Sequence, residues 1–219
     1  MKRYIILDLD GTIINSENTI ESEFLREVEL YKKEYLEGAK YSRKTVSGMG
    51  YRDFLATIFE SKEDIDYMER KVLEILERSK LGFRPFPKAI ETVETLSKNY
   101  TLFLSTWCYT NVAVDILTHL DILKYFAHVQ GSEIIPKSLK HIEICKDITL
   151  DPEFEKYALS VGDGTVEKQV AQDAHIDFIQ VWGIQVDSHY ISCISELCDY
   201  VEHFSSTHSI EIDGQNYML

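Results

Sequence analysis

Short, mostly apolar runs alternate with helical patterns over much of this chain. Adjacent apolar residues without polar interruption are typical of strands buried on both faces of a parallel sheet. Between these runs, apolar residues recur every three or four positions, which predicts amphipathic helices. Five runs are predicted to be strands: Tyr4–Leu7, Tyr100–Thr106, His128–Gln130, Ala158–Val161 and Phe178–Trp182. Strands that alternate with helices in this way predict an α/β fold with a parallel, doubly wound sheet.

The stretch from Asn15 to Phe83 departs from this alternation and is predicted to be helical almost throughout. Its apolar residues form helical stripes, with a break at Ser47–Gly50. Because each stripe needs a partner that buries it, we expect these helices to pack on one another as a small all-helical unit. The two longest stripes are Ile20, Phe24, Val28, Tyr31 and Tyr35, and then Ile65, Met68, Val72, Ile75 and Leu76.

The change of pattern predicts the domain boundaries. We expect a core of residues 1–14 and 84–205, interrupted by a helical domain of residues 15–83. In the tail of residues 206–219, residues 210–217 alternate around an Asp-Gly pair as β-hairpins do. An added edge hairpin and a dimer contact both stay open as interpretations of this tail.

Composition excludes several classes of protein. With 219 residues, 44% of them hydrophobic, the chain is long enough for one sizeable packed core plus an insert. The net charge of −14 argues against nucleic acids and anionic membranes as partners, since both require a basic surface. No apolar run approaches the length that spans a bilayer. A monomer and a homodimer both remain open.

The N-terminus and the cysteines both indicate a cytoplasmic protein. Met1–Arg3 leads directly into the first strand without a small-residue cleavage site, so no signal peptide is expected. The cysteines are scattered and contain no Cys-x-x-Cys pair. We interpret them as reduced thiols rather than as a disulfide framework or zinc ligands. They are Cys108, Cys145, Cys193 and Cys198.

Two carboxylates, Asp8 and Asp10, follow the first strand one residue apart. Side chains alternate along a strand, so both are expected to point the same way as the chain leaves the sheet. Close carboxylates repel each other. Both stay ionised only if a cation lies between them, and otherwise one of them holds a proton. The pair therefore predicts a functional site that holds either a cation or a proton between the two carboxylates.

Other polar residues are expected at the same edge of the sheet. Ser105 and Thr106 end the second predicted strand, and Asp163 follows the fourth. In a doubly wound sheet the ligand site lies beyond the carboxyl ends of the strands. This rule predicts that these residues lie close to Asp8 and Asp10.

These residues resemble the four motifs of the haloacid dehalogenase superfamily, most closely its phosphoglycolate-phosphatase-like branch. The motifs are Asp8-Leu9-Asp10-Gly11-Thr12, a strand that ends in Thr106, a lysine at Lys137 or Lys140, and Gly162-Asp163 with Glu167 four residues on. The resemblance runs from about Lys2 to Ile184. It implies a Rossmann-like core with a helical cap inserted just after the first motif, where the all-helical unit lies in this chain.

The resemblance also implies a role for each residue of the first two motifs. Asp8 would be the nucleophile that forms an aspartyl-phosphate. Asp10 would protonate the leaving oxygen and later deprotonate water, and its backbone carbonyl would bind the metal. An aspartate at position 10 favours phosphoryl transfer over dehalogenation, because a halide leaving group needs no proton. Thr106, which the register favours over Ser105, would donate a hydrogen bond to the phosphate. Trp107 stands where family members often carry Asn.

The remaining motifs imply a cation site and a binding lysine. Mg²⁺ suits oxygen ligands, and the metal-binding residues would be Asp8, Asp10, Asp163 and Glu167. Lys137 fits the motif lysine better than Lys140, since it lies just ahead of the predicted helix. Its charge would stabilise the phosphate.

The cap is expected to choose the substrate. Ser47–Arg52 resembles the loop that reaches from such caps into the active site. Arg52 would then bind a second anionic group on the substrate. A turn between two helices with a surface arginine is an equally good interpretation of this segment.

Together these features predict an enzyme, a Mg²⁺-dependent phosphatase that hydrolyses a small phosphorylated metabolite through an aspartyl-phosphate. The alternatives are a sugar phosphomutase of the same superfamily and a non-catalytic, phosphate-binding regulatory protein that keeps the fold. An intact pair of Asp8 and Asp10 argues against the non-catalytic alternative. The sequence does not identify the phosphomonoester.

Overall fold

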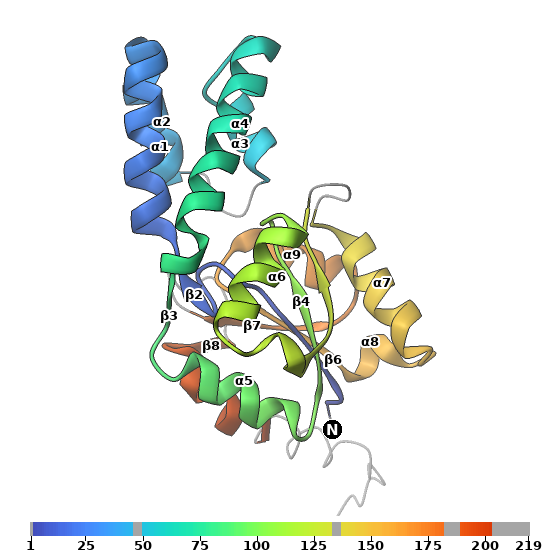
Figure 1. Cartoon of the computed structure of the whole chain (residues 1–219). Helices are drawn as coiled ribbons and strands as arrows, with labels where there is room; N and C mark the ends of the chain where they lie inside the picture. Colours follow the sequence, from blue (N-terminus) through green and yellow to red (C-terminus); the bar gives the residue numbers. More distant parts are fainter. Residues whose placement is uncertain (1, 46–49, 133–136, 182–188, 203–219) are drawn as a thin grey trace, which may run out of the picture.

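A six-stranded parallel sheet forms the centre of the protein in a computed structural model that describes residues 2–45, 50–132, 137–181 and 189–202 (Figure 1). The strands lie in the order β5-β4-β1-β6-β7-β8, and each neighbouring pair is parallel. Their bounds are β1 Tyr4–Leu7, β4 Thr101–Ser105, β5 Phe126–Gln130, β6 Ala158–Gly162, β7 Asp177–Val181 and β8 Tyr190–Ile191. The predicted parallel, doubly wound sheet is confirmed, with β1 at the point where the strand order reverses.

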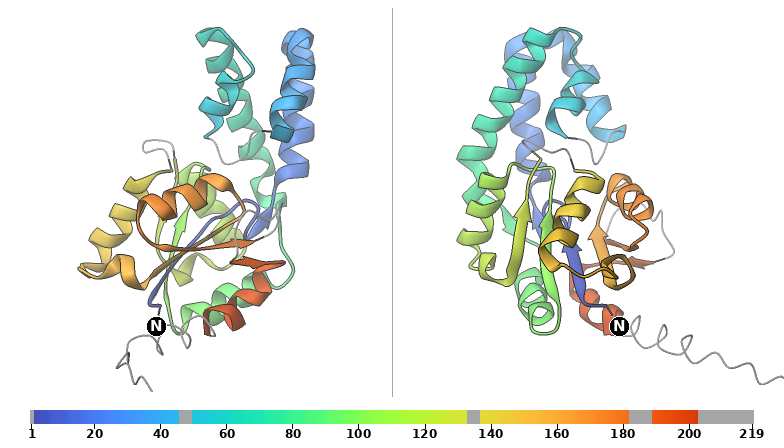
Figure 2. Two further views of the ribbon diagram at one scale, coloured as in Figure 1. Left: turned by 180° about the vertical axis from the view of Figure 1, so that it is seen from behind. Right: turned by 90° about the vertical axis from the view of Figure 1, so that its right-hand side faces the viewer.

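Helices cover both faces of this sheet (Figure 2). On one face, α5 (Ala89–Ser97) and α6 (Thr110–His119) pack on apolar side chains such as Leu7 and Leu104. On the other face, Ile6 and Phe103 lie in a separate apolar cluster. The helices of that cluster are α7 Leu139–Thr149, α8 Phe154–Tyr157 and α9 Thr165–Asp173.

The alternation of side chains along the strands decides which face the functional residues share. Ile6 and Phe103 point toward α7 and α9. Asp8 lies two residues after Ile6, and Ser105 lies two residues after Phe103. Their side chains therefore belong to that face of the sheet as well. The site is therefore built where the apolar cluster under α7 and α9 ends and the strands stop.

Between β1 and the rest of the core, the chain forms the helices of the cap. These are α1 Glu17–Lys32, α2 Leu36–Thr45, α3 Tyr51–Ala56 and α4 Lys62–Ser79, and they stand apart from the sheet in Figures 1 and 2. The predicted stripes are the faces on which these helices pack: Phe24, Val28, Met68 and Val72 are buried, whereas Tyr31 is half-buried. Short 3-10 helices follow α1 and α4 at Lys33–Tyr35 and Lys80–Gly82, and others lie at Leu123–Tyr125 and Ile194–Glu196.

A short antiparallel ribbon joins the cap to the core. It consists of β2 (Ile14–Asn15) and β3 (Arg84–Pro85), and Asn15 pairs with Arg84. The predicted cap limits, residues 15 and 83, lie at this ribbon. Two residues per strand are too few for an alternating pattern, so the sequence did not predict the ribbon. It brings the two crossings between cap and core side by side.

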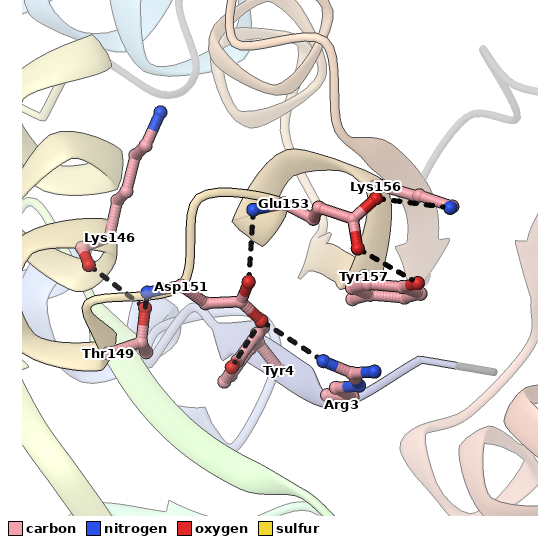
Figure 3. A network of polar contacts seen from close by, with 8 residues as sticks. All are labelled: Arg3, Tyr4, Lys146, Thr149, Asp151, Glu153, Lys156 and Tyr157. Atoms are coloured by element: carbon pink, nitrogen blue, oxygen red, sulfur yellow. Dashed lines mark hydrogen bonds and ion pairs between the residues drawn. The ribbon is translucent and has the colours of Figure 1, made fainter.

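A polar network holds the start of β1 at the opposite end from the cap (Figure 3). The Asp151 carboxylate accepts hydrogen bonds from the Tyr4 hydroxyl at 2.8 Å, the Arg3 guanidinium at 3.2 Å and the Glu153 backbone N–H at 3.0 Å. The Arg3 guanidinium also lies over the Tyr157 ring. These contacts fix the central strand against the loop between α7 and α8.

Some predictions concern segments outside the described residues. The hairpin predicted in the tail of residues 206–219, the end of a strand at Trp182 and most of the Ser47–Gly50 segment belong to them. Among the helices that the structure does describe, none combines the length and the apolar character that crossing a membrane requires.

Candidate active site

A buried lysine lies between two buried carboxylates where β1 ends. Lys137 Nζ is 3.0 Å from Asp8 Oδ1 and 2.7 Å from Glu167 Oε1. Asp8 directly follows β1, Lys137 lies just ahead of α7, and Glu167 lies in the first turn of α9. Three segments far apart in the sequence are thus joined by one ammonium group.

The local turn after β1 holds the Asp8 carboxylate in place. Asp8 Oδ1 accepts a hydrogen bond from the Leu9 backbone N–H at 2.8 Å. Gly11 then adopts φ +74°, a left-handed conformation that glycine tolerates, and its N–H donates to the Ile14 carbonyl. This tight turn leads the chain from the end of β1 into β2.

The carboxylates of Asp8, Asp163 and Glu167 form a cluster whose oxygens lie within 4.8 Å of one another. Glu167 Oε2 is buried and has no hydrogen-bond partner among the described residues. A buried acceptor without a partner is unfavourable unless something donates to it or coordinates it. A divalent cation that takes oxygen ligands would satisfy this atom, so the residues present fit Mg²⁺.

Glycines leave the space that these carboxylates occupy. A Cβ atom at Gly164 would lie 2.2 Å from Glu167 Oε2, and one at Gly11 would lie 2.3 Å from Asp163 Oδ2. The Glu167 side chain is accommodated because position 164 carries no side chain.

Burial and neighbouring charges shift the pKa values of the groups in this cluster. Burial raises the pKa of the Asp8 carboxyl well above its usual range, and Glu167 and Asp163 raise it further against the opposing charge of Lys137. Burial disfavours a charged Lys137, but the neighbouring carboxylates outweigh this and raise the pKa of its ammonium. Burial also opposes ionisation of Glu167, yet Lys137 lowers its pKa. These shifts favour the charged forms of Lys137 and Glu167, whereas burial opposes the charged form of Asp8.

Asp10 lies outside the acidic cluster and has a partner that the sequence did not indicate. Its Oδ1 accepts a short hydrogen bond from the Ser16 hydroxyl, and Ser16 is buried at the N-terminus of α1. The residue that precedes the first cap helix thereby orients the second acid of the motif. A serine six residues after Asp10 carries no recognisable signal by itself. The role of Asp10 toward a metal, through its backbone carbonyl, stays a prediction.

The two candidate hydroxyls after β4 have different surroundings. The Thr106 Oγ1 atom accepts a hydrogen bond from the Cys108 backbone N–H at 3.1 Å, so the hydroxyl keeps its own proton to donate. Ser105 Oγ lies 2.8 Å from His141 Nδ1, and both side chains are buried. His141, which the sequence analysis did not single out, ties the end of β4 to α7. The phosphate contact of Thr106 stays a prediction.

Of the two candidate lysines, Lys137 reaches Asp8, whereas Lys140 is exposed on α7. Arg52, the predicted substrate-binding residue, lies on α3 of the cap. Its guanidinium forms ion pairs with Asp66 and Glu69 of α4. These carboxylates neutralise it in this conformation, and its contact with substrate stays a prediction.

The comparisons with known proteins agree with this architecture. A family profile described as haloacid dehalogenase-like hydrolase matches residues 5–181. The protein therefore belongs to the haloacid dehalogenase-like hydrolase family, and the predicted resemblance is confirmed. No curated protein matches the sequence significantly.

Solved structures share the fold at low sequence identity. A haloacid dehalogenase-like hydrolase from Streptococcus pneumoniae is 20% identical, with a TM-score of 0.74 over 91% of this chain and 98% of that one. A predicted phosphoglycolate phosphatase from Haemophilus somnus is 18% identical, with a TM-score of 0.77 over 91% and 98%. A beta-phosphoglucomutase from Clostridium difficile is 14% identical, with a TM-score of 0.73 over 96% and 100%. The fold is the common property.

Proposed function

We propose that this protein is a Mg²⁺-dependent phosphatase that hydrolyses a small phosphorylated metabolite through an aspartyl-phosphate on Asp8. The observation that carries the proposal is the buried contact of Lys137 with Asp8, beside the carboxylates of Asp163 and Glu167. One positive side chain against three acids leaves a site that favours a cation and an anionic ester together.

The contacts of Asp8 indicate which of its oxygens reacts. Oδ1 accepts hydrogen bonds from Leu9 and Lys137, so Oδ2 is the nucleophile. As the bond from Oδ2 to phosphorus forms, the bond from phosphorus to the ester oxygen breaks, and Asp10 gives its proton to that oxygen. Water then attacks phosphorus as the bond from phosphorus to Asp8 Oδ2 breaks, Asp10 takes a proton of this water, and free phosphate and the Asp8 carboxylate result.

The other residues stabilise the transferred group. Thr106 donates its hydroxyl proton to a phosphoryl oxygen, and Lys137 offsets the negative charge that Asp8 and the phosphoryl group share. A Mg²⁺ ion held by Asp8, Asp10, Asp163 and Glu167 would supply electrostatic compensation for the approach of a carboxylate to a dianionic ester.

A panel of phosphomonoesters tests the proposal. Purified protein is incubated with phosphoglycolate, sugar phosphates and nucleotides, and free phosphate is measured with Mg²⁺ and with a chelator. We expect phosphate release that requires Mg²⁺ and is lost in Asp8→Asn. Equal release by wild type and Asp8→Asn would contradict the proposal. An isomeric sugar phosphate in place of phosphate would indicate the phosphomutase alternative, and binding without turnover the regulatory one.

A further inference from the structure

Trp107 lies where the core meets the cap. It directly follows Thr106, and the edge of its six-membered ring lies against Gly50, just ahead of α3. A Cβ atom at position 50 would lie 2.9 Å from Cζ3 and 3.0 Å from Cε3 of the indole. The cap backbone therefore approaches the ring as closely as glycine permits.

The neighbouring Tyr109 contacts the cap as well. Its ring stacks on Tyr51 with centroids 6.3 Å apart and an interplanar angle of 11°. Its hydroxyl donates a 3.5 Å hydrogen bond to Glu69 of α4. Residues 107–109, which we call the docking segment, thus connect the predicted phosphate-binding Thr106 to the cap helices α3 and α4.

The other edge of the indole carries an unused donor. Trp107 Nε1 is buried and has no hydrogen-bond partner among the residues that the structure describes. In an indole ring, Nε1 lies on the side opposite to Cε3 and Cζ3, so the N–H points away from the Gly50 contact. Buried Trp N–H groups usually find an acceptor, because leaving one unpaired is unfavourable.

We propose that Trp107 is a specificity-determining residue whose N–H donates to an oxygen on the leaving group of the substrate. This inference rests on the proposed function and narrows its substrate class to small phosphomonoesters with a hydroxyl or carboxylate oxygen near the ester bond. The position supports this interpretation, because the residue lies one step from Thr106 and beneath the cap. A substrate with such an oxygen satisfies the orphaned donor, and an alkyl phosphate leaves it unsatisfied.

Two substrates of similar size test the proposal. Glycerol phosphate and propyl phosphate differ in their hydroxyl groups, and kcat/KM is measured for both with wild type and Trp107→Phe. Phenylalanine keeps an aromatic side chain at this position but removes the donor together with one of the two indole rings. We expect the ratio of kcat/KM for glycerol phosphate over propyl phosphate to fall about tenfold in Trp107→Phe, the usual effect of one neutral hydrogen bond.

Tyr109→Phe is the matched control. It removes the contact with Glu69 in the same docking segment but leaves the indole donor in place. A change that only disturbs cap docking alters kcat/KM equally for both substrates. The ratio of the two kcat/KM values should therefore stay within twofold of wild type in Tyr109→Phe. An unchanged ratio in Trp107→Phe, or an equal fall in both variants, would overturn the assignment.

A binding measurement separates this inference from the proposed function. The chain contains two tryptophans, so Trp182→Phe leaves Trp107 as the sole tryptophan, which is excited selectively over the tyrosines, and Asp8→Asn prevents turnover. We expect glycerol phosphate to change the fluorescence of this double variant at lower concentration than propyl phosphate. This difference is independent of hydrolysis, so it survives a failure of the phosphatase proposal. Equal titration curves would contradict the role of Trp107.

Discussion

Lys137 and Asp8 form a buried ion pair, with Nζ 3.0 Å from Oδ1, at the carboxyl end of the central strand. Glu167 shares the same ammonium group. A buried charge of this kind is tolerated only when it is paired, so each member of the trio depends on the other two. The relationship joins Asp8, the proposed nucleophile, to Lys137 just ahead of α7 and to Glu167 in the first turn of α9.

We expect Lys137→Met to lower kcat by a factor of about 10²–10³, because it removes the positive charge next to Asp8 and keeps the length of the side chain. Steady-state phosphate release measures the effect. Lys140→Met is the matched control, since Lys140 is an exposed lysine in the first turn of α7, three residues after Lys137, and its kcat should stay within about twofold of wild type. A larger loss in Lys140→Met than in Lys137→Met would show that the motif lysine is assigned wrongly.

Gly164→Ala should weaken Mg²⁺ binding by a factor of about 10–100, a common effect of disturbing the support of a metal ligand. The new Cβ atom would lie 2.2 Å from Glu167 Oε2 and displace that oxygen from the acidic cluster. Calorimetric titration with Mg²⁺ gives the affinity without reference to turnover. Gly82→Ala serves as the control, because a Cβ atom there has no neighbour within 4 Å. Unchanged affinity in Gly164→Ala would exclude Glu167 Oε2 as a ligand.

Gly50→Ala is expected to lower kcat/KM about tenfold or more, since misplacing a site by about 1 Å can reduce rates by 10²-fold. The added methyl group meets the Trp107 ring at 2.9 Å, so the cap can no longer pack as closely on the docking segment. Gly38→Ala, in the cap but with open space around it, should leave kcat/KM unchanged. Similar kinetics for both variants would show that the contact of Gly50 with Trp107 is dispensable.

The stability of the cap should depend on pH through Asp64. Its buried carboxylate accepts hydrogen bonds from Lys32 at 2.6 Å and from Tyr31 at 2.7 Å, and these contacts lower its pKa. A depressed pKa in the folded state stabilises the protein above the unfolded pKa of about 4, and this contribution is lost as the pH falls through the folded value. Asp64→Asn should therefore destabilise the protein at neutral pH and flatten its loss of stability in acid.

Urea unfolding of wild type and Asp64→Asn at neutral and acidic pH measures this difference. Glu37, an exposed acid on α2, offers the control variant Glu37→Gln. We expect the control to follow the wild-type pH dependence. Parallel curves for wild type and Asp64→Asn would contradict the assigned role of the carboxylate.

The parts of the fold that the sequence predicted are those with long, regular patterns. The run Tyr4–Leu7 is buried on both faces, which makes it unbroken and recognisable. The cap stripe that contains Met68 and Val72 is recognisable because one face of the helix is buried over several turns. By contrast, β8 and the ribbon of β2 and β3 have two residues per strand, and no periodicity can develop over that length.

The candidate site was predictable to the extent that its residues follow strand ends. Asp8 and Asp163 do so, and the geometry of parallel sheets brings them together. The partners that orient the site come from tertiary contacts instead. Neither the hydrogen bond of Ser16 to Asp10 nor that of Ser105 to His141 has a local sequence pattern, because each joins residues from different elements.

The same limit applies to Arg52 on the cap. The resemblance of Ser47–Arg52 to a cap loop left a substrate-binding and a surface role open for Arg52, and the substrate-binding role stays a prediction. The carboxylates that pair with it in this conformation lie on the neighbouring helix. Asp66 and Glu69 follow Arg52 by more than a dozen residues, so only the packing of α3 on α4 brings them together. A charge pattern read along the chain does not contain this information.

The most direct test of the central claim is the detection of a phosphoryl group on Asp8. Wild-type protein is mixed with Mg²⁺ and a substrate identified from the panel, quenched in acid within the first turnover, and digested for mass spectrometry. The account predicts a peptide containing Asp8 that carries one phosphoryl group, which decays as phosphate appears and is absent in Asp8→Asn. Phosphate release in the first turnover with no phosphorylated Asp8 peptide, or with the group on another residue, would contradict it.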